Sequence, residues 1–198
     1  MRRVLVLGAT SAIATEVARR HHARGDRLHL VGRNAEKLQE IVKELSSSVV
    51  TSDVADFGDV HANEGRVRQY LDALGGGVDT VLVAHGELGD QLLSESSFTE
   101  AERIFVTNFT SVVSLLLPLA NHLEAARAGS IGVITSVAGD RGRPRNYTYG
   151  AAKGALNVYL QGLRTRLYGS GVKITTLKLG PVDTPMTVDH EKTRLFGT

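Results

Sequence analysis

Short apolar runs alternate along the whole chain with segments of helical periodicity. Runs such as RVLVLG, residues 3–8, are too apolar for a half-exposed strand and suit one buried on both faces. Strands of this kind that alternate with helices form a parallel sheet with helices packed on each side. Right-handed crossovers then give a doubly wound α/β fold with three layers, α/β/α.

The pattern predicts six strands and five helices in one domain. No repeat or linker divides residues 1–198, and the more polar segment 54–77 gives the least clear signal. The strands are expected at 3–8, 27–32, 48–53, 78–86, 130–136 and 172–179. The helices are expected at 12–25, 34–45, about 63–74, 99–124 and 149–169, with Asn34 as an N-cap and Gly25 at a helix end.

Composition narrows the function classes. The net charge of +2 gives no reason to expect a nucleic-acid partner. The chain has no cysteine, which excludes disulfides and zinc–thiolate sites and fits a cytoplasmic protein, and we assign no metal site. The apolar run Val4–Leu7 is too short for a signal peptide, and 111–120 is too short to span a membrane and contains Pro118.

Ligands of doubly wound folds bind beyond the carboxyl ends of the strands, so the strand ends are where function is expected. The stretch GATSAIA, residues 8–14, follows the first strand and opens the first helix. Gly8 permits a tight turn there, and a helix N-terminus attracts phosphate. The alternative is that these small residues serve packing alone. The phosphate interpretation makes cofactor contacts of Gly8, Thr10, Ser11, Ala12 and Ile13.

The second strand ends at GRN, residues 32–34. A carboxylate at this place binds the ribose 2′-hydroxyl of NAD, whereas an arginine accommodates the 2′-phosphate of NADP. Arg33 is present and the first acid is Glu36, which favours NADP and leaves NAD as the second choice. The alternative is a solvated surface arginine.

Several markers follow one another in the order typical of one family. They are the GATSAIA stretch, Asp53 with Val54, VAHG at 83–86, Asn108, Ser136, Tyr149 with Lys153 as YxxxK, and LGPVDTPM at 179–186. Asn108 precedes Ser136 by 28 residues, and Ser136 precedes Tyr149 by 13. In these features the chain resembles the short-chain dehydrogenase/reductase family from residue 3 to about 187. The resemblance implies a Rossmann-type, dinucleotide-binding oxidoreductase domain.

Helical spacing distinguishes the two tyrosines of YTYGAAK, residues 147–153. Tyr149 and Lys153 are four residues apart and share a helix face. Tyr147 and Lys153 are six apart, roughly 240° around a helix, so their side chains diverge. A nearby ammonium would stabilise the phenolate, so we expect Lys153 to lower the pKa of Tyr149.

The resemblance implies a role for each marker. Tyr149 would be the general acid/base, Ser136 would bind the substrate oxygen, Lys153 would also hold the nicotinamide ribose, and Asn108 would order a proton-relaying water. The remaining cofactor contacts implied by the resemblance are Asp53, Val54, Ala84, His85, Gly86, Pro181, Val182 and Thr184. The expected activity is NADP(H)-dependent hydride transfer with a small-molecule carbonyl or secondary alcohol.

Two features of the C-terminal half affect the substrate side. Arg141, Arg143 and Arg145 lie between Ser136 and Tyr149 and would suit an anionic substrate, although a solvated loop is the simpler interpretation. The chain ends soon after the cofactor loop, so we expect it to lack the family's substrate-covering helices and last strand. A homodimer or homotetramer could still form through the helices near 99–124 and 149–169.

Two other functions remain as alternatives. A non-catalytic NAD(P)-binding sensor or scaffold would be expected to have lost Tyr149, Lys153 or Ser136, and all three are present. A sugar epimerase or dehydratase also uses YxxxK. The short chain and the three-residue gap between Gly8 and Ala12 argue against it.

Overall fold

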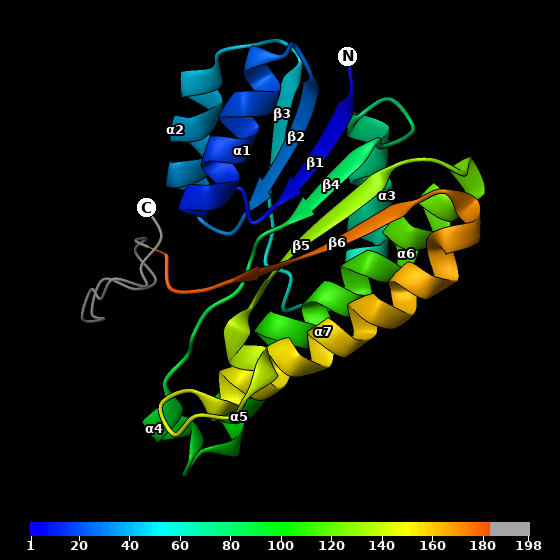
Figure 1. The fold of residues 1–198 in the computed structure, drawn as a ribbon. Helices are drawn as coiled ribbons and strands as arrows, with labels where there is room; N and C mark the ends of the chain where they lie inside the picture. The colour runs from blue at the N-terminus through cyan, green and yellow to red at the C-terminus, as the bar shows by residue number, and fades with distance from the viewer. Residues whose placement is uncertain (183–198) are drawn as a thin grey trace.

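Six parallel strands form one sheet in the computed structural model of the protein, which describes residues 1–182 (Figure 1). The strands are β1 (Arg3–Leu7), β2 (Arg27–Gly32), β3 (Val50–Val54), β4 (Thr80–Val83), β5 (Ser130–Ser136) and β6 (Lys173–Leu179). Their spatial order is β3-β2-β1-β4-β5-β6. The chain therefore winds outward in both directions from the β1–β4 pair, which is the doubly wound arrangement predicted from the sequence.

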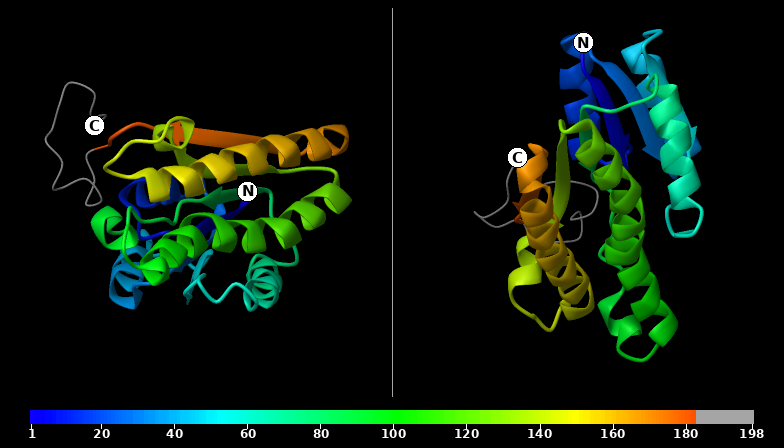
Figure 2. Two further views of the ribbon diagram at one scale, coloured as in Figure 1. Left: turned by 90° about the horizontal axis from the view of Figure 1, so that it is seen from below. Right: turned by 90° about the vertical axis from the view of Figure 1, so that its right-hand side faces the viewer.

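Helices cover both faces of the sheet and complete the three layers. On one face lie α1 (Ala12–Ala23) and α2 (Ala35–Leu45), and on the other lie α3 (Asn63–Ala73), α6 (Ser111–Ala126) and α7 (Tyr147–Leu167). Figure 2 shows α6 and α7 side by side along their length. The short α4 (Gln91–Ser94) and α5 (Phe98–Phe105) extend beyond the carboxyl ends of the strands (Figure 1).

The packing of β1 explains why each of its residues from Val4 to Leu7 is apolar. Val4 and Val6 pack into the core beneath α1 and α2, whereas Leu5 and Leu7 pack into the core beneath α3, α6 and α7. All four side chains are completely buried. Because successive strand residues point to opposite faces, a strand between two helical layers must be apolar on both.

Two of the local helix signals behave as predicted. The Asn34 side chain accepts a hydrogen bond from the Lys37 backbone N–H at 2.9 Å and so caps α2. The first helix ends at Ala23, two residues before Gly25, whose φ of +75° takes the chain out of the helix.

Several predicted boundaries are wrong. The strand predicted at 78–86 forms ladder pairs only over Thr80–Val83, and β3 begins at Val50 rather than at 48. The helix predicted at 149–169 begins two residues earlier, so Tyr147 is its first residue. The short α4 was not predicted.

The helix predicted at 99–124 is α5, a π-helical turn over Val106–Thr110, and then α6. The Asn108 side chain donates to the Ile104 carbonyl at 2.9 Å, the carbonyl that an α-helix would offer to the Asn108 backbone N–H. That competition accounts for the wider turn, and helical periodicity alone does not reveal it.

The continuous helical stretch Phe98–Ala126 is long and apolar enough to cross a membrane by length and composition. Its leucines Leu115, Leu119 and Leu123 are nevertheless completely buried in the core against the sheet. The apolar character of this stretch is therefore that of a core helix.

Replacing Leu119 tests this packing. Leu119→Ala removes a completely buried side chain from α6, so we expect the free energy of unfolding to fall by about 2–5 kcal/mol in urea denaturation. The control Leu92→Ala changes a leucine on α4 that is 78% exposed and should have little effect. Equal effects of the two changes would contradict the assignment of α6 to the core.

Candidate active site

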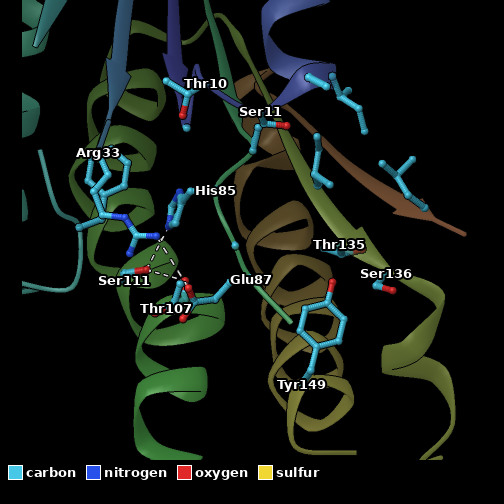
Figure 3. A pocket seen from close by; sticks show the side chains of 18 of the residues that line it. Thr10, Ser11, Arg33, His85, Glu87, Thr107, Ser111, Thr135, Ser136 and Tyr149 are labelled. Carbon is cyan, nitrogen blue, oxygen red and sulfur yellow. Dashed lines mark hydrogen bonds and ion pairs between the residues drawn. The ribbon is translucent and has the colours of Figure 1, made fainter. Parts of the chain in front are cut away.

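A cleft of about 350 Å³ opens at the carboxyl ends of the strands (Figure 3). Its walls come from the segments that follow β1, β2, β3, β4 and β6, from the last residues of β5, and from residues of α1, α2, α7 and the helical stretch after α5. The cleft thus lies where a doubly wound fold binds its ligand.

Gly8 makes the floor of the cleft possible. Its φ is +86°, and a Cβ placed on it would lie 2.5 Å from the backbone nitrogen of His85. The backbones that follow β1 and β4 are therefore in direct contact at this point. A side chain at position 8 would be strained in conformation and would also push these two segments apart.

The turn after Gly8 leads into the N-terminus of α1. Ser11 is the N-cap with extended backbone, and its side chain makes no capping hydrogen bond. Thr10, Ser11, Ala12 and Ile13 all line the cleft. The N–H groups of a first helical turn have no partner within the helix, so this end of α1 can bind an anion such as a pyrophosphate.

The side of the cleft next to the end of β2 is basic. Arg33 follows β2, Lys37 lies in the first turn of α2, and both line the cleft. The Arg33 side chain is 68% exposed, and its Nη2 lies 3.8 Å from the Glu87 carboxylate. Of the two basic residues, sequence analysis identified only Arg33.

The end of β3 lies outside the wall of the cleft. Asp53 does not line the cleft, and its carboxylate lies 3.2 Å from Nε2 of the buried His29. Val54 is 58% exposed and does not line the cleft either. The wall here is formed by the next four residues, 55–58, which follow the end of β3 at Val54.

Asn108, Gly86 and Lys153 lie close together next to the part of the cleft that contains Tyr149. Asn108 is completely buried in the π-helical turn. Its Nδ2 donates to the Glu87 carbonyl at 2.9 Å, and its Oδ1 accepts from the Glu87 N–H at 3.2 Å. A Cβ on Gly86 would lie 2.8 Å from Asn108 Oδ1 and 3.1 Å from Lys153 Nζ. The missing side chain at position 86 therefore leaves room for both groups.

The Lys153 ammonium is deeply buried. The residue is 3% exposed, and its Nζ lies 5.6 Å from the centre of the Tyr149 ring. Burial disfavours the charged form and lowers the pKa of Lys153 to about 8. This lysine can therefore exchange a proton much closer to neutral pH than an exposed lysine can.

Tyr149 and Ser136 lie close together in the wall of the cleft (Figure 3). Ser136 is the last residue of β5, and its Oγ accepts a hydrogen bond from the Ala138 N–H at 3.1 Å. Burial raises the pKa of Tyr149, and a hydrogen-bonding contribution from Ser136 opposes the rise. The expected lowering by Lys153 is therefore wrong for this structure, since burial dominates and the Lys153 ammonium approaches the ring face.

His85 is a neutral residue in the wall between the two halves. Its Nε2 lies 3.0 Å from Ser111 Oγ, and Ser111 Oγ donates to the Thr107 carbonyl at 2.9 Å. Because the Ser111 proton is used in that bond, Ser111 accepts from a His85 Nε2–H group. Burial, followed by the charges of Lys153 and Arg33, lowers the pKa of His85 to about 3.

The structure brings most of the predicted residues to the cleft. Those that line it are Gly8, Thr10, Ser11, Ala12, Ile13, Arg33, Ala84, His85, Gly86, Ser136, Tyr149 and Val182. Asn108 and Lys153 lie just behind this wall. Pro181 is exposed and outside the wall, like Asp53 and Val54, and Thr184 lies outside the described residues. Arg141, Arg143 and Arg145 are exposed and do not line the cleft.

Sequence reasoning missed about half of the wall. The missed residues are Lys37, Ala55, Asp56, Phe57, Gly58, Glu87, Thr107, Ser111, Ile134, Thr135, Leu179 and Gly180. Glu87 directly follows VAHG, and Asp56 lies two residues after the end of β3, so the strand-end rule could have found both. Thr107 and Ser111 give no such signal, because the π-helical turn decides which side chains of that segment face the cleft.

The residues present fit a phosphorylated dinucleotide. Gly8 and Gly86 leave space that a Cβ would fill, α1 offers its N-terminus, and Arg33 and Lys37 supply positive charge at the far end. Among residues 1–182, no cluster of three His, Asp or Glu side chains is arranged to hold a metal ion.

Comparisons with known proteins agree with this geometry. The family model described as short chain dehydrogenase matches residues 2–195. An uncharacterised oxidoreductase from the mprA 5′ region of Streptomyces coelicolor is 37% identical, over 94% of this chain and 74% of its own. One from Mycobacterium tuberculosis is 36% identical, over 93% of this chain and 74% of its own. A variant of actinorhodin polyketide ketoreductase with NADPH superposes with a TM-score of 0.85 at 25% identity, covering 97% of this chain and 78% of its own.

The buried amine makes stability depend on pH. Lys153 has a pKa of about 8 in the folded protein against an ordinary 10.5, so between these values the unfolded chain holds more protons. The free energy of unfolding should therefore rise with pH across this window. Lys153→Met removes the effect, so the stability of the wild-type protein relative to this variant should increase from about pH 7 to about pH 10 in urea denaturation. The control Lys173→Met changes an exposed lysine and should keep the wild-type pH dependence; a wild-type slope in Lys153→Met would contradict the shift.

Proposed function

The chain belongs to the short-chain dehydrogenase/reductase family, and from this premise we propose that it is an NADP(H)-dependent oxidoreductase acting on a carbonyl or secondary alcohol. One observation carries the proposal. A tyrosine and a serine lie close together in the wall of the cleft, and a buried lysine lies against the tyrosine ring. This arrangement can hold an oxygen atom and deliver a proton to it.

Tyr149 is the proposed proton donor in the reduction direction. Bound NADPH would supply hydride to the carbonyl carbon. Ser136 donates a hydrogen bond to the carbonyl oxygen and holds it beside the Tyr149 hydroxyl, which gives its proton to that oxygen as negative charge develops there. The raised pKa of Tyr149 keeps the phenol protonated at neutral pH, as this step requires.

Lys153 and Asn108 are proposed to restore that proton. With its pKa of about 8, Lys153 carries a proton at neutral pH and can release it readily. Asn108 Oδ1 and Lys153 Nζ lie 2.8 and 3.1 Å from the place where a Cβ of Gly86 would stand, so the two groups border the same space. We therefore assign Asn108 to a relay, through water, that connects Lys153 to solvent.

Arg33 and Lys37 support the preference for NADP over NAD. Both are cationic, both line the cleft after β2, and the β2–α2 turn at 33–35 carries no carboxylate. A 2′-phosphate would find charge there, whereas a ribose diol would lack the usual acidic acceptor. The NADPH-bound ketoreductase of similar fold supports the same assignment, and NAD remains the second choice.

Two measurements separate this function from the two alternatives. NADPH consumption is followed by absorbance with a panel of ketones, and NADPH binding is measured by calorimetry. Binding without turnover of any ketone would favour a non-catalytic sensor or scaffold. Conversion of a nucleotide sugar without net consumption of NADPH would favour an epimerase or dehydratase. Absence of both NADPH binding and turnover would overturn the proposal.

Self-association and a cytoplasmic location stay predictions. Leu117 on α6 is 47% exposed and Val158 on α7 is 68% exposed, which would suit a homodimer or homotetramer formed through these helices. Light scattering on the purified protein would measure the oligomeric state directly.

Tyr149→Phe tests the chemistry most directly. It removes only the hydroxyl, so we expect kcat to fall by about 10²–10⁴-fold while NADPH binding is retained. The control Tyr147→Phe changes the first residue of α7, which is 46% exposed and does not line the cleft, and kcat should change little. Comparable losses in both variants would contradict the assignment of Tyr149.

Arg33→Gln tests the cofactor preference. Loss of a charge-assisted contact to the 2′-phosphate should raise the Kd for NADPH about tenfold and leave that for NADH nearly unchanged, as measured by calorimetry. The control Arg24→Gln removes an exposed arginine outside the cleft and should alter neither value. An equal increase in the Kd for NADH would show that Arg33 does not contact the 2′-phosphate.

A further inference from the structure

Arg33 reaches inward across the cleft instead of pointing away from it. It begins at the end of β2, and its Nη2 lies 3.8 Å from Oε2 of Glu87 in the segment after β4 (Figure 3). The Arg33 charge also contributes to the lowered pKa of His85, whose ring forms the wall between these two points. The guanidinium therefore lies over the space that the nucleotide would enter.

Glu87 can release Arg33 without being left as an unpaired carboxylate. The Glu87 side chain is 23% exposed, and it also forms an ion pair with Arg103 on α5. Arg103 in turn donates to Glu100 through two nitrogens, each at 2.7 Å. Glu87 thus has two arginine partners. Arg103 is held on α5 by Glu100, whereas the Arg33 side chain is mostly exposed to solvent. Arg33 is therefore the partner that can move at little cost in free energy.

Lys37 marks where Arg33 would go. It lines the cleft from the first turn of α2, on the same side as the backbone of Arg33. A 2′-phosphate placed at this turn would be contacted by both cations, and its dianion would attract the guanidinium more strongly than the single charge of a carboxylate shared with Arg103. Contact with the phosphate draws Arg33 back toward its own turn and away from Glu87.

We propose that Glu87 competes with the 2′-phosphate of NADP(H) for Arg33. The inference rests on the proposed preference for NADP(H) over NAD(H) and adds a residue that determines how strong this preference is. Glu87 holds Arg33 across the cleft, so part of the binding free energy of the phosphate is used to break that pair. Glu87 consequently lowers the affinity for the phosphorylated dinucleotide and narrows the preference for it over the unphosphorylated one.

The test uses two nucleotide fragments whose binding can be measured without any reaction taking place. Calorimetry measures the Kd of adenosine 2′,5′-bisphosphate and of 5′-AMP for the wild-type protein and for Glu87→Gln. An exposed ion pair of this kind affects binding by about two- to fivefold, so Glu87→Gln should tighten the bisphosphate by that factor and leave 5′-AMP unchanged. In an Arg33→Gln background the same change at Glu87 should have no effect on either fragment.

A matched control removes a charge near the phosphate but outside the ion pair. Glu36→Gln deletes an exposed carboxylate in the first turn of α2, closer in sequence to Arg33 than Glu87 is. Tightening by Glu36→Gln equal to that of Glu87→Gln would show a general charge effect and overturn the inference. Equal tightening of both fragments by Glu87→Gln, no tightening, or an effect that persists without Arg33 would overturn it as well.

A second variant covers the case in which Glu87→Gln does not fold. Glu87→Asp keeps the charge but withdraws it from Arg33 by one methylene, so the bisphosphate should again bind more tightly than to the wild-type protein.

The proposed NADP(H) preference and the inference about Glu87 are contradicted by different results. A wild-type protein that binds the bisphosphate no better than 5′-AMP contradicts the NADP(H) preference, whereas a clear preference with unchanged Glu87 variants contradicts only the inference about Glu87.

Discussion

The backbone contact between Gly8 and His85 is the constraint on which the cleft depends. Strands β1 and β4 are neighbours in the sheet, yet the segments after them lead to helices on opposite faces. The two segments can touch at their bases only because Gly8 has no Cβ, which would approach the His85 nitrogen to 2.5 Å. From that shared base they diverge, and the divergence opens a space with a helix N-terminus on one side and a buried lysine on the other.

Exclusion of water explains how ordinary side chains acquire unusual acidities here. Burial raises the pKa of Tyr149 and lowers that of Lys153 to about 8. The ordinary pKa values of tyrosine and lysine, 10.0 and 10.5, are close together, but within the cleft the Lys153 ammonium becomes clearly the stronger acid. Proton movement from Lys153 toward a tyrosinate is therefore favourable, and its direction follows from desolvation rather than from a specific bond between the two groups.

The sequence allowed the sheet, the helix on which Tyr149 and Lys153 lie, and the glycine turn to be predicted, because each depends on local pattern. Apolar residues at every position of β1 require two covered faces, and YxxxK requires only helical periodicity. The side chains of Asp53 and Glu87 could not be placed in this way. Their directions depend on His29 and Arg33, partners on a neighbouring strand and across the cleft, and no short-range pattern encodes such contacts.

The π-helical turn at Val106–Thr110 accommodates one residue more than an α-helical turn would. Relative to an unbroken helix, everything after it is rotated by about 100° around the axis. This offset lets one continuous stretch direct Asn108 toward Lys153 and Leu115 toward the sheet. The register of the stretch is thus set by its number of residues as well as by their chemistry. Among variants of this protein, loss of a single residue from this turn would misalign the core and Asn108 together, whereas most substitutions there would disturb only one of them.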